Sequence, residues 1–303
     1  MPCRAEDLPM STSIVPVQPV IPSDRLRQKF KGIGLTLKNN VMVDRNLRFR
    51  NPAYVASNCI VMRTQIDAYS YMERFSVASN TTIGRYCSIG HYVDMAMGIH
   101  NYERFTTSPA FYNNMIFMDH SGVIEEEDPD FTARGMNNEV KIGNDVWIGA
   151  YVNIPASVTI GHGAVISTNT VITKDVPPYA IVVGGPDNNG RGSQHILKYR
   201  FPDEIISDLL EIKWWDYDLP RMIAQGIKVP RDNIADLISF IKNEDRDKLL
   251  PLSDQWRLCS FASADRAFIF PSRPDTFMDY NAVEVDNQTG AGVRLLNTRT
   301  DNH

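Results

Sequence analysis

The stretch that decides the fold is Val140–Pro178, which reads VKIGNDVWIGAYVNIPASVTIGHGAVISTNTVITKDVPP. Isoleucine stands at every sixth position of this stretch: Ile142, Ile148, Ile154, Ile160, Ile166 and Ile172. A small or β-branched residue follows each isoleucine by four positions, and glycine follows three of them directly. A step of six residues carries helical side chains to different faces, so the pattern excludes an α-helix. It is typical of a parallel β-helix, in which short strands wind into stacked coils and the isoleucines point inward.

The same period is visible before this stretch and then stops. We expect coils from about Ile60, with inward residues Ile66, Met72, Val77, Ile83, Ile89 and Met95 and one slip of register between positions 72 and 77. Cys87 follows Ile83 by four positions, so it is predicted to be core. Residues 96–139 carry no repeat and are predicted to form a long inserted loop. Loops of this length in compact domains are usually functional.

The flanks of the repeat divide the rest of the chain. Residues 1–55 are predicted to be an extended, proline-bearing arm followed by a basic, solvated lead-in, and residues 56–186 the β-helix domain with its loop at 96–139. Residues 187–250 are predicted to be helical, with Asp203 as a cap and a second helix within 231–250. Residues 251–303 are predicted to be a wrapping extension.

Composition limits the partners. The net charge of −5 argues against nucleic acid as a partner. The chain contains no run of 18 apolar residues, so we expect no membrane span. The first residues lack a signal-peptide pattern. The four cysteines are scattered without a CxxC pair, which favours a reducing cytoplasm and argues against a zinc site.

Several motifs together resemble one family. IGNDVWIG (142–149), TKDVPPY (173–179), IGRYCSIG (83–90) and IDAYSYM (66–72) are similar to strings of the hexapeptide-repeat acyltransferases. The resemblance is strongest to the branch that acetylates streptogramins and chloramphenicol and to relatives that O-acetylate sugars. It implies an all-β core, a left-handed parallel β-helix with an inserted loop and C-terminal α-helices. It also implies a homotrimer with shared active sites and acetyl-CoA as cosubstrate, without a metal.

Acyl transfer to a hydroxyl needs a base, and histidine suits this role because its pKa lies near neutral pH. The resemblance puts the catalytic base on His100, since Thr106–Pro109 match the family's string that follows its histidine. The other histidines (His91, His120, His162 and His195) lack this flank. No serine or cysteine lies in a nucleophile motif, so we expect direct transfer.

The resemblance also implies the binding residues. The coenzyme is expected to contact Trp147, Gly149, Ala150, Thr168, Lys174 and Arg191. The 185–194 turn lacks the family's lysine, and Arg191, Lys198 and Arg200 are the substitutes for a phosphate contact. The acceptor is expected to contact Tyr69, Tyr71, Tyr92 and Ser108. For Tyr69 and Tyr71, the alternative is that they are outward aromatics packing on a neighbouring segment.

The resemblance implies an acetyl-CoA-dependent O-acetyltransferase that acts on a sugar, glycan or antibiotic hydroxyl. FTTSPAFY (105–112) resembles the sugar-modifying branch and favours a sugar. The alternative is a non-catalytic β-helix scaffold or ligand-binding subunit. A zinc enzyme of the carbonic anhydrase kind needs three converging histidines, and only His162 lies in the run 140–178.

Overall fold

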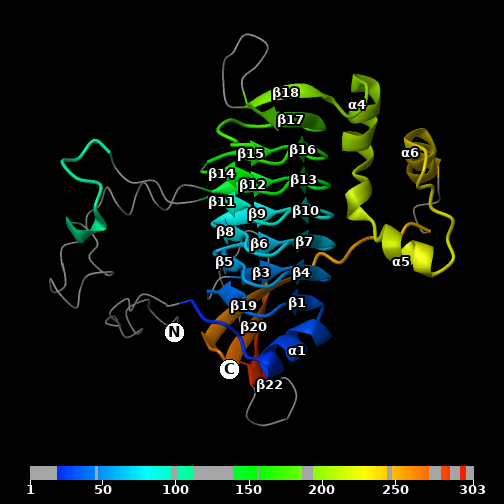
Figure 1. The fold of residues 1–303 in the computed structure, drawn as a ribbon. Coiled ribbons are helices and arrows are strands. Elements are labelled where there is room, and N and C mark those ends of the chain that lie inside the picture. Colours follow the sequence, from blue (N-terminus) through cyan, green and yellow to red (C-terminus); the bar gives the residue numbers. More distant parts are fainter. Residues whose placement is uncertain are drawn as a thin grey trace, which may run out of the picture.

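The chain winds into a triangular prism of stacked coils (Figure 1). This computed structural model describes residues 19–44, 47–96, 102–111, 139–155, 157–185, 194–243, 248–272, 281–286 and 294–297. Each coil adds a short strand to each of three sheets, and neighbouring strands within the prism run parallel. The predicted parallel β-helix with C-terminal helices is confirmed.

The strands of the three sheets follow the coils. Sheet 1 contains, in spatial order, β1 (Leu35–Leu37), β4 (Ala53–Val55), β7 (Ser70–Met72), β10 (Ser88–Ile89), β13 (Trp147–Ile148), β16 (Val165–Ile166), β17 (Ala180–Gly184) and the antiparallel β18 (Gln194–Tyr199). Sheet 2 contains β14 (Asn153–Ile154), β11 (Asp94–Met95), β8 (Val77–Ser79), β5 (Ile60–Met62) and β2 (Met42–Val43). Sheet 3 contains β15 (Thr159–Ile160), β12 (Val140–Ile142), β9 (Thr81–Ile83), β6 (Gln65–Ile66), β3 (Leu47–Phe49), β19 (Trp256–Ser263), β20 (Arg266–Ser272), β21 (Asn281–Asp286) and β22 (Arg294–Asn297).

The six periodic isoleucines form the axis of the core. Each is at most 3% exposed, and they stack in register, Ile142 on Ile160 and Ile148 on Ile166. Burying one such side chain stabilises the fold by roughly 1.5–3 kcal/mol before the entropic cost of ordering. Cys87 is fully buried, as predicted.

Inward hydroxyls at the coil corners join one coil to the next. Ser70 Oγ donates to the carbonyl of Gly84 (2.5 Å) and accepts from the N–H of Cys87 (2.9 Å). Ser76 Oγ donates to the carbonyl of Gly90 (2.9 Å) and accepts from the N–H of Val93 (3.0 Å). A buried hydroxyl is tolerated when it both donates and accepts a hydrogen bond. Ser70 and Ser76 do both, so they connect coils without leaving a buried polar group unpaired.

The prism begins earlier than the predicted start at Ile60. β1, β2 and β3 already form a coil, and β1 pairs with β4 in parallel. The preceding helix α1 (Asp24–Gly32) covers the end of the prism with Leu26 and Phe30, both fully buried. Within residues 1–55, the prediction of a solvated lead-in is therefore wrong, because the apolar residues of that lead-in enter the core.

The register slip also lies elsewhere. Ala78, not Val77, is the inward residue of β8, with Ala78 fully buried and Val77 half-buried. The shortened step is the five-residue interval from Ala78 to Ile83, at the corner between sheets 2 and 3. An equal interval separates Val61 from Ile66 at the same corner one coil earlier.

The inserted loop leaves the prism at that same corner. β11 of sheet 2 ends at Met95, and β12 of sheet 3 begins at Val140. Figure 1 shows the described piece 102–111 standing beside the prism, on the side of sheet 2. The piece contains the 3₁₀ helix η1 (Pro109–Phe111).

The C-terminal helices are α4 (Asp203–Ile212), η3 (Trp214–Asp216), α5 (Leu219–Ala224) and α6 (Ile234–Asn243). Of these, α4 and η3 pack on the corner between sheets 3 and 1, whereas α6 packs on α4. Tyr179 and Leu209 lie in the shared apolar cluster that joins α4 to the prism. The predicted cap by Asp203 is wrong, because Pro202 is the N-cap residue and makes no side-chain cap hydrogen bond.

The last segment returns to the N-terminal end of the prism. β19 pairs antiparallel with β3, and β20, β21 and β22 continue sheet 3. Phe261 is buried against Phe30 of α1, with ring centroids 5.2 Å apart. The predicted wrapping extension is thus a run of strands added to the sheet.

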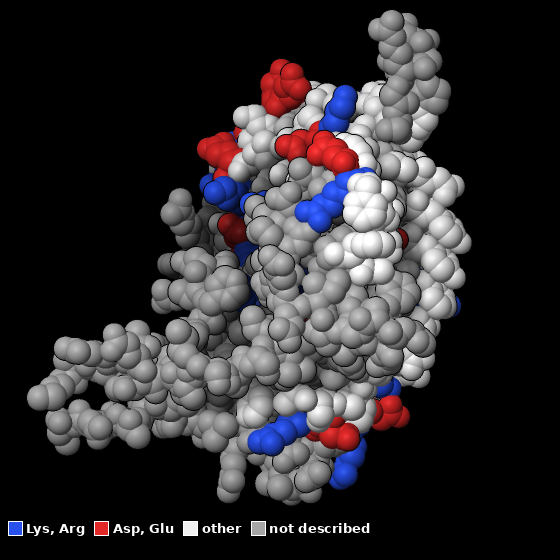
Figure 2. Space-filling model, turned by 90° about the vertical axis from the view of Figure 1, so that its left-hand side faces the viewer, with Lys and Arg blue, Asp and Glu red and all other residues white. Residues whose placement is uncertain are grey.

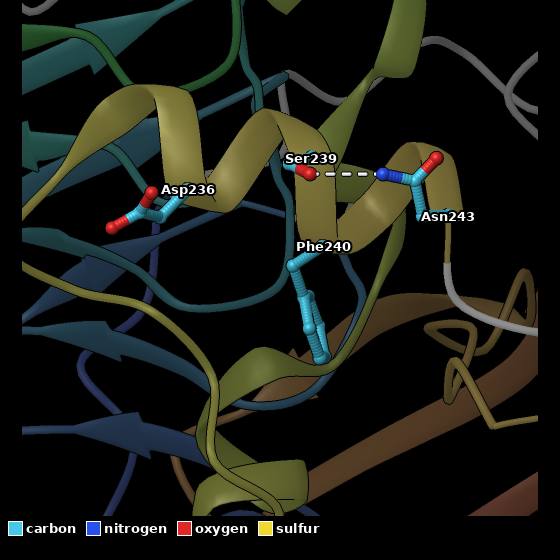
Figure 3. Close-up of a pocket in the computed structure, with 4 residues that line it drawn as sticks. All are labelled: Asp236, Ser239, Phe240 and Asn243. Atoms are coloured by element: carbon cyan, nitrogen blue, oxygen red, sulfur yellow. Dashed lines mark hydrogen bonds between the residues drawn. The ribbon is translucent and has the colours of Figure 1, made fainter.

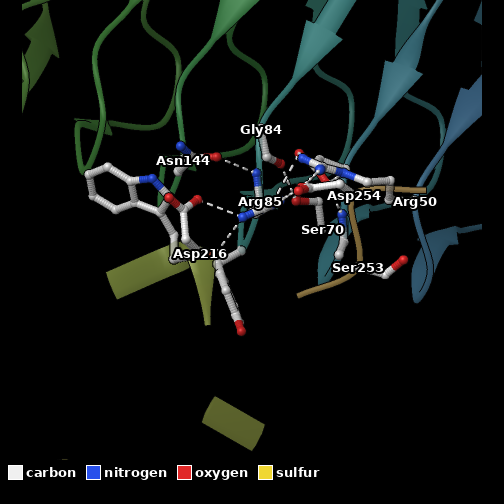
Figure 4. Close-up of polar contacts among 12 residues, drawn as sticks. Arg50, Ser70, Gly84, Arg85, Asn144, Asp216, Ser253 and Asp254 are labelled. Carbon is white, nitrogen blue, oxygen red and sulfur yellow. Dashed lines mark hydrogen bonds and ion pairs between the residues drawn. The ribbon is translucent and has the colours of Figure 1, made fainter. Parts of the chain in front are cut away.

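A charged network ties this return to the coils (Figure 4). Arg85 is 5% exposed and donates to the carboxylates of Asp216 (2.6 Å) and Asp254 (3.3 Å). Arg50 pairs with the buried Asp67 and donates to Asp254 (3.0 Å). Two coils, η3 and the segment before β19 are therefore joined by ion pairs around one buried guanidinium.

Candidate functional site

Four of the predicted coenzyme residues, Trp147, Gly149, Ala150 and Thr168, gather at the corner between sheets 1 and 2, called here the 1–2 corner. Its six turns are residues 38–40, 56–58, 73–75, 90–92, 149–151 and 167–169. The third residue of each turn has a positive φ between 55° and 61°: Asn40, Asn58, Phe75, Tyr92, Tyr151 and Asn169. Asparagine tolerates this left-handed conformation well, whereas aromatic residues need compensating contacts.

Stacking of the aromatic rings supplies those contacts. The rings of Phe75, Tyr92 and Tyr151 lie one above another with centroids 5.0 Å apart and nearly parallel planes. His91 meets Tyr92 and Tyr151 edge-on at 5.7 and 5.4 Å. Tyr92, predicted to contact the acceptor, is therefore part of an exposed aromatic ladder beside the predicted coenzyme residues.

Two turns of this corner begin with a glycine, because the next coil lies too close to leave room for a side chain. A Cβ on Gly149 would lie 2.7 Å from the backbone nitrogen of Thr168 and 2.9 Å from its Oγ1. Gly90 faces Ala150 in the same way, with 2.8 Å to its nitrogen. Close stacking of successive turns explains these glycines without any ligand.

Several turns of this corner leave a backbone donor open: among the described residues, Ser57, His91, Ala150 and Thr168 have no acceptor for their N–H. The N–H of Gly149, in contrast, donates to the carbonyl of Ile166 (2.8 Å). Ala150 is half-buried and Thr168 is exposed. Exposed N–H groups on a rigid turn are suited to bind carbonyl oxygens of a ligand.

Trp147 stands next to these donors on the outer face of sheet 1. Its side chain is 57% exposed, and no ring contact to a described residue is formed. In the same outward row, Ser88 and then Tyr71 lie one and two coils below it. Tyr71 is 39% exposed, so both aromatics face solvent on one side of the prism.

The structure does not bring three other predicted residues to this place. Lys174 lies at the corner between sheets 2 and 3, where its backbone is held by Gln194 through two hydrogen bonds of 3.1 Å. Tyr69 lies at the corner between sheets 3 and 1 and donates its hydroxyl to Asp218 (2.5 Å). Arg200 binds Asp145 (2.9 Å), which engages it within the fold.

Tyr69 is occupied by the chain itself. Its ring stacks on Tyr86 with 5.0 Å between centroids, and burial together with Asp218 raises the pKa of its phenol. These contacts favour the packing alternative for Tyr69. Lys198 is exposed on β18 and remains the available cation among the described substitutes for the phosphate contact.

His100 and Arg191 lie outside the described residues. Ser108 is described: its Oγ accepts from the N–H of Ala110 (3.4 Å), an arrangement that starts η1. The same piece exposes three large aromatics, Tyr102, Phe105 and Phe111, at 78%, 86% and 61%. These side chains find no cover on the described part of their own prism.

His162 has a structural role, because its ring is held by contacts within the fold. Its Nδ1 accepts from the backbone N–H of Asn144 (2.8 Å), which fixes the neutral form with hydrogen on Nε2. The ring stacks on Trp215 at 4.7 Å, and burial lowers its pKa. No three His, Cys, Asp or Glu side chains of the described ranges are grouped to hold a metal ion.

A depression on α6 offers fewer groups for ligand binding than the 1–2 corner. The depression has a volume of about 350 Å³ and is lined by Asp236, Ser239, Phe240 and Asn243, and Figure 3 shows Asn243 bonded to Ser239. It holds one carboxylate and no other charged group. Among the charged residues drawn in Figure 2, both signs are mixed toward the two ends of the visible face. Within the described ranges, no helix has the length and apolar character to cross a membrane.

The sequence reasoning missed Tyr151 and Phe75. A signal was present, because each stands three residues after an inward residue, as Tyr92 does after Ile89. That offset marks the left-handed position of every turn at this corner.

The comparisons with known proteins agree with this architecture. Residues 139–174 match the family described as bacterial transferase hexapeptide (six repeats). Chloramphenicol acetyltransferase of Klebsiella aerogenes is 37% identical over 166 residues, which is 52% of this chain and 70% of the relative. Its namesake from Agrobacterium fabrum is 34% identical over 181 residues, which is 59% of this chain and 79% of the relative. A probable macrolide acetyltransferase of Lysinibacillus sphaericus is 33% identical over 143 residues, covering 46% of this chain and 72% of the relative.

Solved structures overlay poorly. AntD, an N-acyltransferase from Bacillus cereus, has a TM-score of 0.38 at 16% identity and covers 64% of this chain and 98% of its own. A hexapeptide-repeat acetyltransferase of Vibrio cholerae has a TM-score of 0.30 at 20% identity, covering 54% and 72%. Scores this low carry no argument. The sequence relatives and the coiled architecture suffice: the chain belongs to the hexapeptide-repeat acetyltransferases.

Proposed function

We propose that this protein transfers an acetyl group from acetyl-CoA to a hydroxyl of a sugar, glycan or antibiotic acceptor, directly and without a metal. One observation carries the proposal. Trp147 and the open N–H groups of Ala150 and Thr168 lie together at a rigid corner, where a thioester with its amide-bearing arm can be held by backbone donors. The relatives named as acetyltransferases support the same reaction.

His100 is the proposed general base. Its imidazole takes the proton of the acceptor hydroxyl while the hydroxyl oxygen bonds to the acyl carbon, and the carbon–sulfur bond then breaks. The imidazolium returns the proton to the departing sulfur, so that protons balance over the turnover. The N–H groups of Ala150 and Thr168 are the proposed donors to the carbonyl oxygen as it gains negative charge.

We propose that the active unit is a homotrimer. Trp147 lies toward the 1–2 corner, whereas Met95 and Val140, which flank the segment that contains His100, lie at the corner between sheets 2 and 3. The width of sheet 2 separates Trp147 from these flanking residues within one chain. A neighbouring subunit that presents its loop to the 1–2 corner brings His100 to Trp147, and the exposed Tyr102, Phe105 and Phe111 supply apolar area for that contact. We further propose a cytoplasmic setting, which the free, buried thiols of Cys59, Cys87 and Cys259 fit.

Thiol release from acetyl-CoA, measured with chloramphenicol, a macrolide and a panel of sugars, tests the function. We expect release that depends on an acceptor, and mass spectrometry of that acceptor should show one added acetyl group on oxygen. Addition to an amine, or no release with any acceptor, would reject the proposal.

The base is tested by a pair of variants from the same loop. His100→Ala should lower kcat by roughly 10²–10⁴ with little change in coenzyme affinity. His120→Ala is the matched control, because it removes a loop histidine that lacks the flanking motif. If His120→Ala abolishes turnover and His100→Ala does not, the assignment is wrong.

A further inference from the structure

The lower half of the 1–2 corner contains a groove that no assigned residue occupies. Its volume is about 470 Å³. It is lined by nine residues from three successive turns and the adjoining strand β4: Lys38, Asn39, Tyr54, Ala56, Ser57, Asn58, Glu73, Arg74 and Phe75. The proposed coenzyme residues belong to the upper turns of the same corner, so one edge of the prism carries two different surfaces.

The two surfaces differ mainly in charge. The upper turns present the rings of Tyr92 and Tyr151 beside the open backbone donors of Ala150 and Thr168, and they contain no lysine or arginine. The groove presents two aromatic rings, Tyr54 and Phe75, together with the amides of Asn39 and Asn58. Aromatic faces combined with amide and hydroxyl groups fit a sugar ring, which has apolar C–H faces and a polar rim.

The groove also carries an excess of positive charge. Lys38 and Arg74 line it, against the single carboxylate of Glu73. Lys38 Nζ lies 5.8 Å from the centre of the Tyr54 ring, and neither cation forms an ion pair with a described residue. Arg50, Arg85 and Arg200, in contrast, are all paired with carboxylates. The groove therefore has charge available for an anionic ligand.

Its distance from the proposed transfer point sets the length of the ligand. Turn 73–75 lies two coils below turn 149–151, and turn 38–40 lies four coils below it. With strands 4.7–4.9 Å apart, these steps amount to roughly 10 and 19 Å. A single sugar in the groove cannot also reach Ala150.

We propose that this groove binds an acidic sugar unit of an extended glycan acceptor, while another unit of the same glycan presents its hydroxyl beside Trp147. The inference rests on the proposed acetyltransferase function and names its substrate class. Lys38 and Arg74 contact the carboxylate or other anionic group of the bound unit, and the rings of Tyr54 and Phe75 contact its C–H faces.

Isothermal titration tests the groove without reference to turnover. The probes are tetragalacturonic acid, the neutral tetrasaccharide maltotetraose and free galacturonic acid. We expect the acidic tetrasaccharide to bind at least tenfold more tightly than either of the others, and its affinity to fall with added salt. Equal binding of the neutral tetrasaccharide, or of the single acidic sugar, overturns the proposal.

Variants locate the binding. The double substitution Lys38→Ala with Arg74→Ala should weaken binding of tetragalacturonic acid roughly three- to tenfold, the range for two exposed ion pairs. Lys228→Ala with Arg231→Ala is the control, since it removes two exposed cations outside the groove and should leave the affinity unchanged. If the Lys38→Ala, Arg74→Ala double variant binds tetragalacturonic acid as tightly as the parent, the proposed site is wrong.

The thiol-release assay with chloramphenicol keeps the two hypotheses apart. If acetyl transfer occurs and the acidic tetrasaccharide does not bind, the groove is wrong and the function stands. If binding is selective and lost in the groove variant, but no acceptor supports thiol release, the function is wrong and the groove stands.

Discussion

Replacing Gly149 by alanine should damage both the stacking of the coils and the proposed coenzyme contact. The new Cβ would lie 2.7 Å from the nitrogen of Thr168, 2.9 Å from its Oγ1 and 3.0 Å from the carbonyl oxygen of Ile166. Two of these atoms are backbone of the next coil, so no side-chain rotation relieves the contact. The coils must separate locally, and such overpacking costs about 1–3 kcal/mol.

Thermal unfolding at fixed protein concentration measures the effect. A loss of 1 kcal/mol lowers Tm by about 2–4 °C in a domain of 150–250 residues, so Gly149→Ala should melt roughly 2–12 °C lower. Because Thr168 is displaced, its N–H is misplaced as well. The KM for acetyl-CoA should rise about two- to tenfold, the equivalent of one lost hydrogen bond.

Gly32→Ala is the matched control. Nothing lies within 4 Å of a Cβ built on Gly32, and its φ is not in the left-handed region. This variant should melt within about 1 °C of the parent, since alanine at a helix end is tolerated. If both variants melt alike, or if Gly149→Ala leaves Tm and KM unchanged, close coil stacking is not the reason for this glycine.

Trp147→Ala should raise the KM for acetyl-CoA in the thiol-release assay while Tm stays near that of the parent, because the side chain is mostly exposed; an unchanged KM would remove Trp147 from the site. Burial lowers the pKa of His162 below its unfolded value of about 6.5, so its contribution to stability should be complete above that pH and be lost as the pH falls below it. Urea unfolding between pH 5 and 8 should show this loss, and His162→Gln should flatten it. Arg85→Ala should lower the free energy of unfolding by about 1.5–3 kcal/mol, the range for hydrogen bonds to charged groups, and a neutral result would show that the network adds no stability. Light scattering should give three times the 34.3 kDa chain mass, and a monomer would reject the shared site.

The sequence predicted the upper coils well because their inward residues are chemically uniform. Isoleucine repeats from Ile142 onward, glycine follows three of these six isoleucines, and all six are buried. The first coil was not predicted, because its inward residues are of mixed types and no glycine follows them. These residues, Leu37, Val43, Phe49 and Val55, keep the period of six, so only their spacing indicated a coil.

The site was predicted in part. Trp147, Gly149, Ala150 and Thr168 were placed together through motif resemblance, and the prism does unite them at one corner. Lys174 lies at a different corner from Thr168, because a spacing of six moves to the next corner and not along the same one, and its coenzyme contact stays a prediction. The ion pairs of Arg85 with Asp216 and Asp254 join positions more than 130 residues apart, and local patterns carry no signal for them.

The covered lower end of the prism limits how far the molecule can grow. A stack of parallel strands ends in a row of free amide and carbonyl groups, which is a template for another copy and the start of a fibril. Here each of the three sheets is covered at its lower edge. In sheet 1, α1 lies against β1; in sheet 2, Val20 bridges to Val43 of β2; and in sheet 3, β19 pairs with β3. The antiparallel direction of β19 also breaks the repeat that a second prism would continue. A chain shortened before β19 would present the bare edge of β3, and its first defect would be head-to-tail polymerisation of folded prisms.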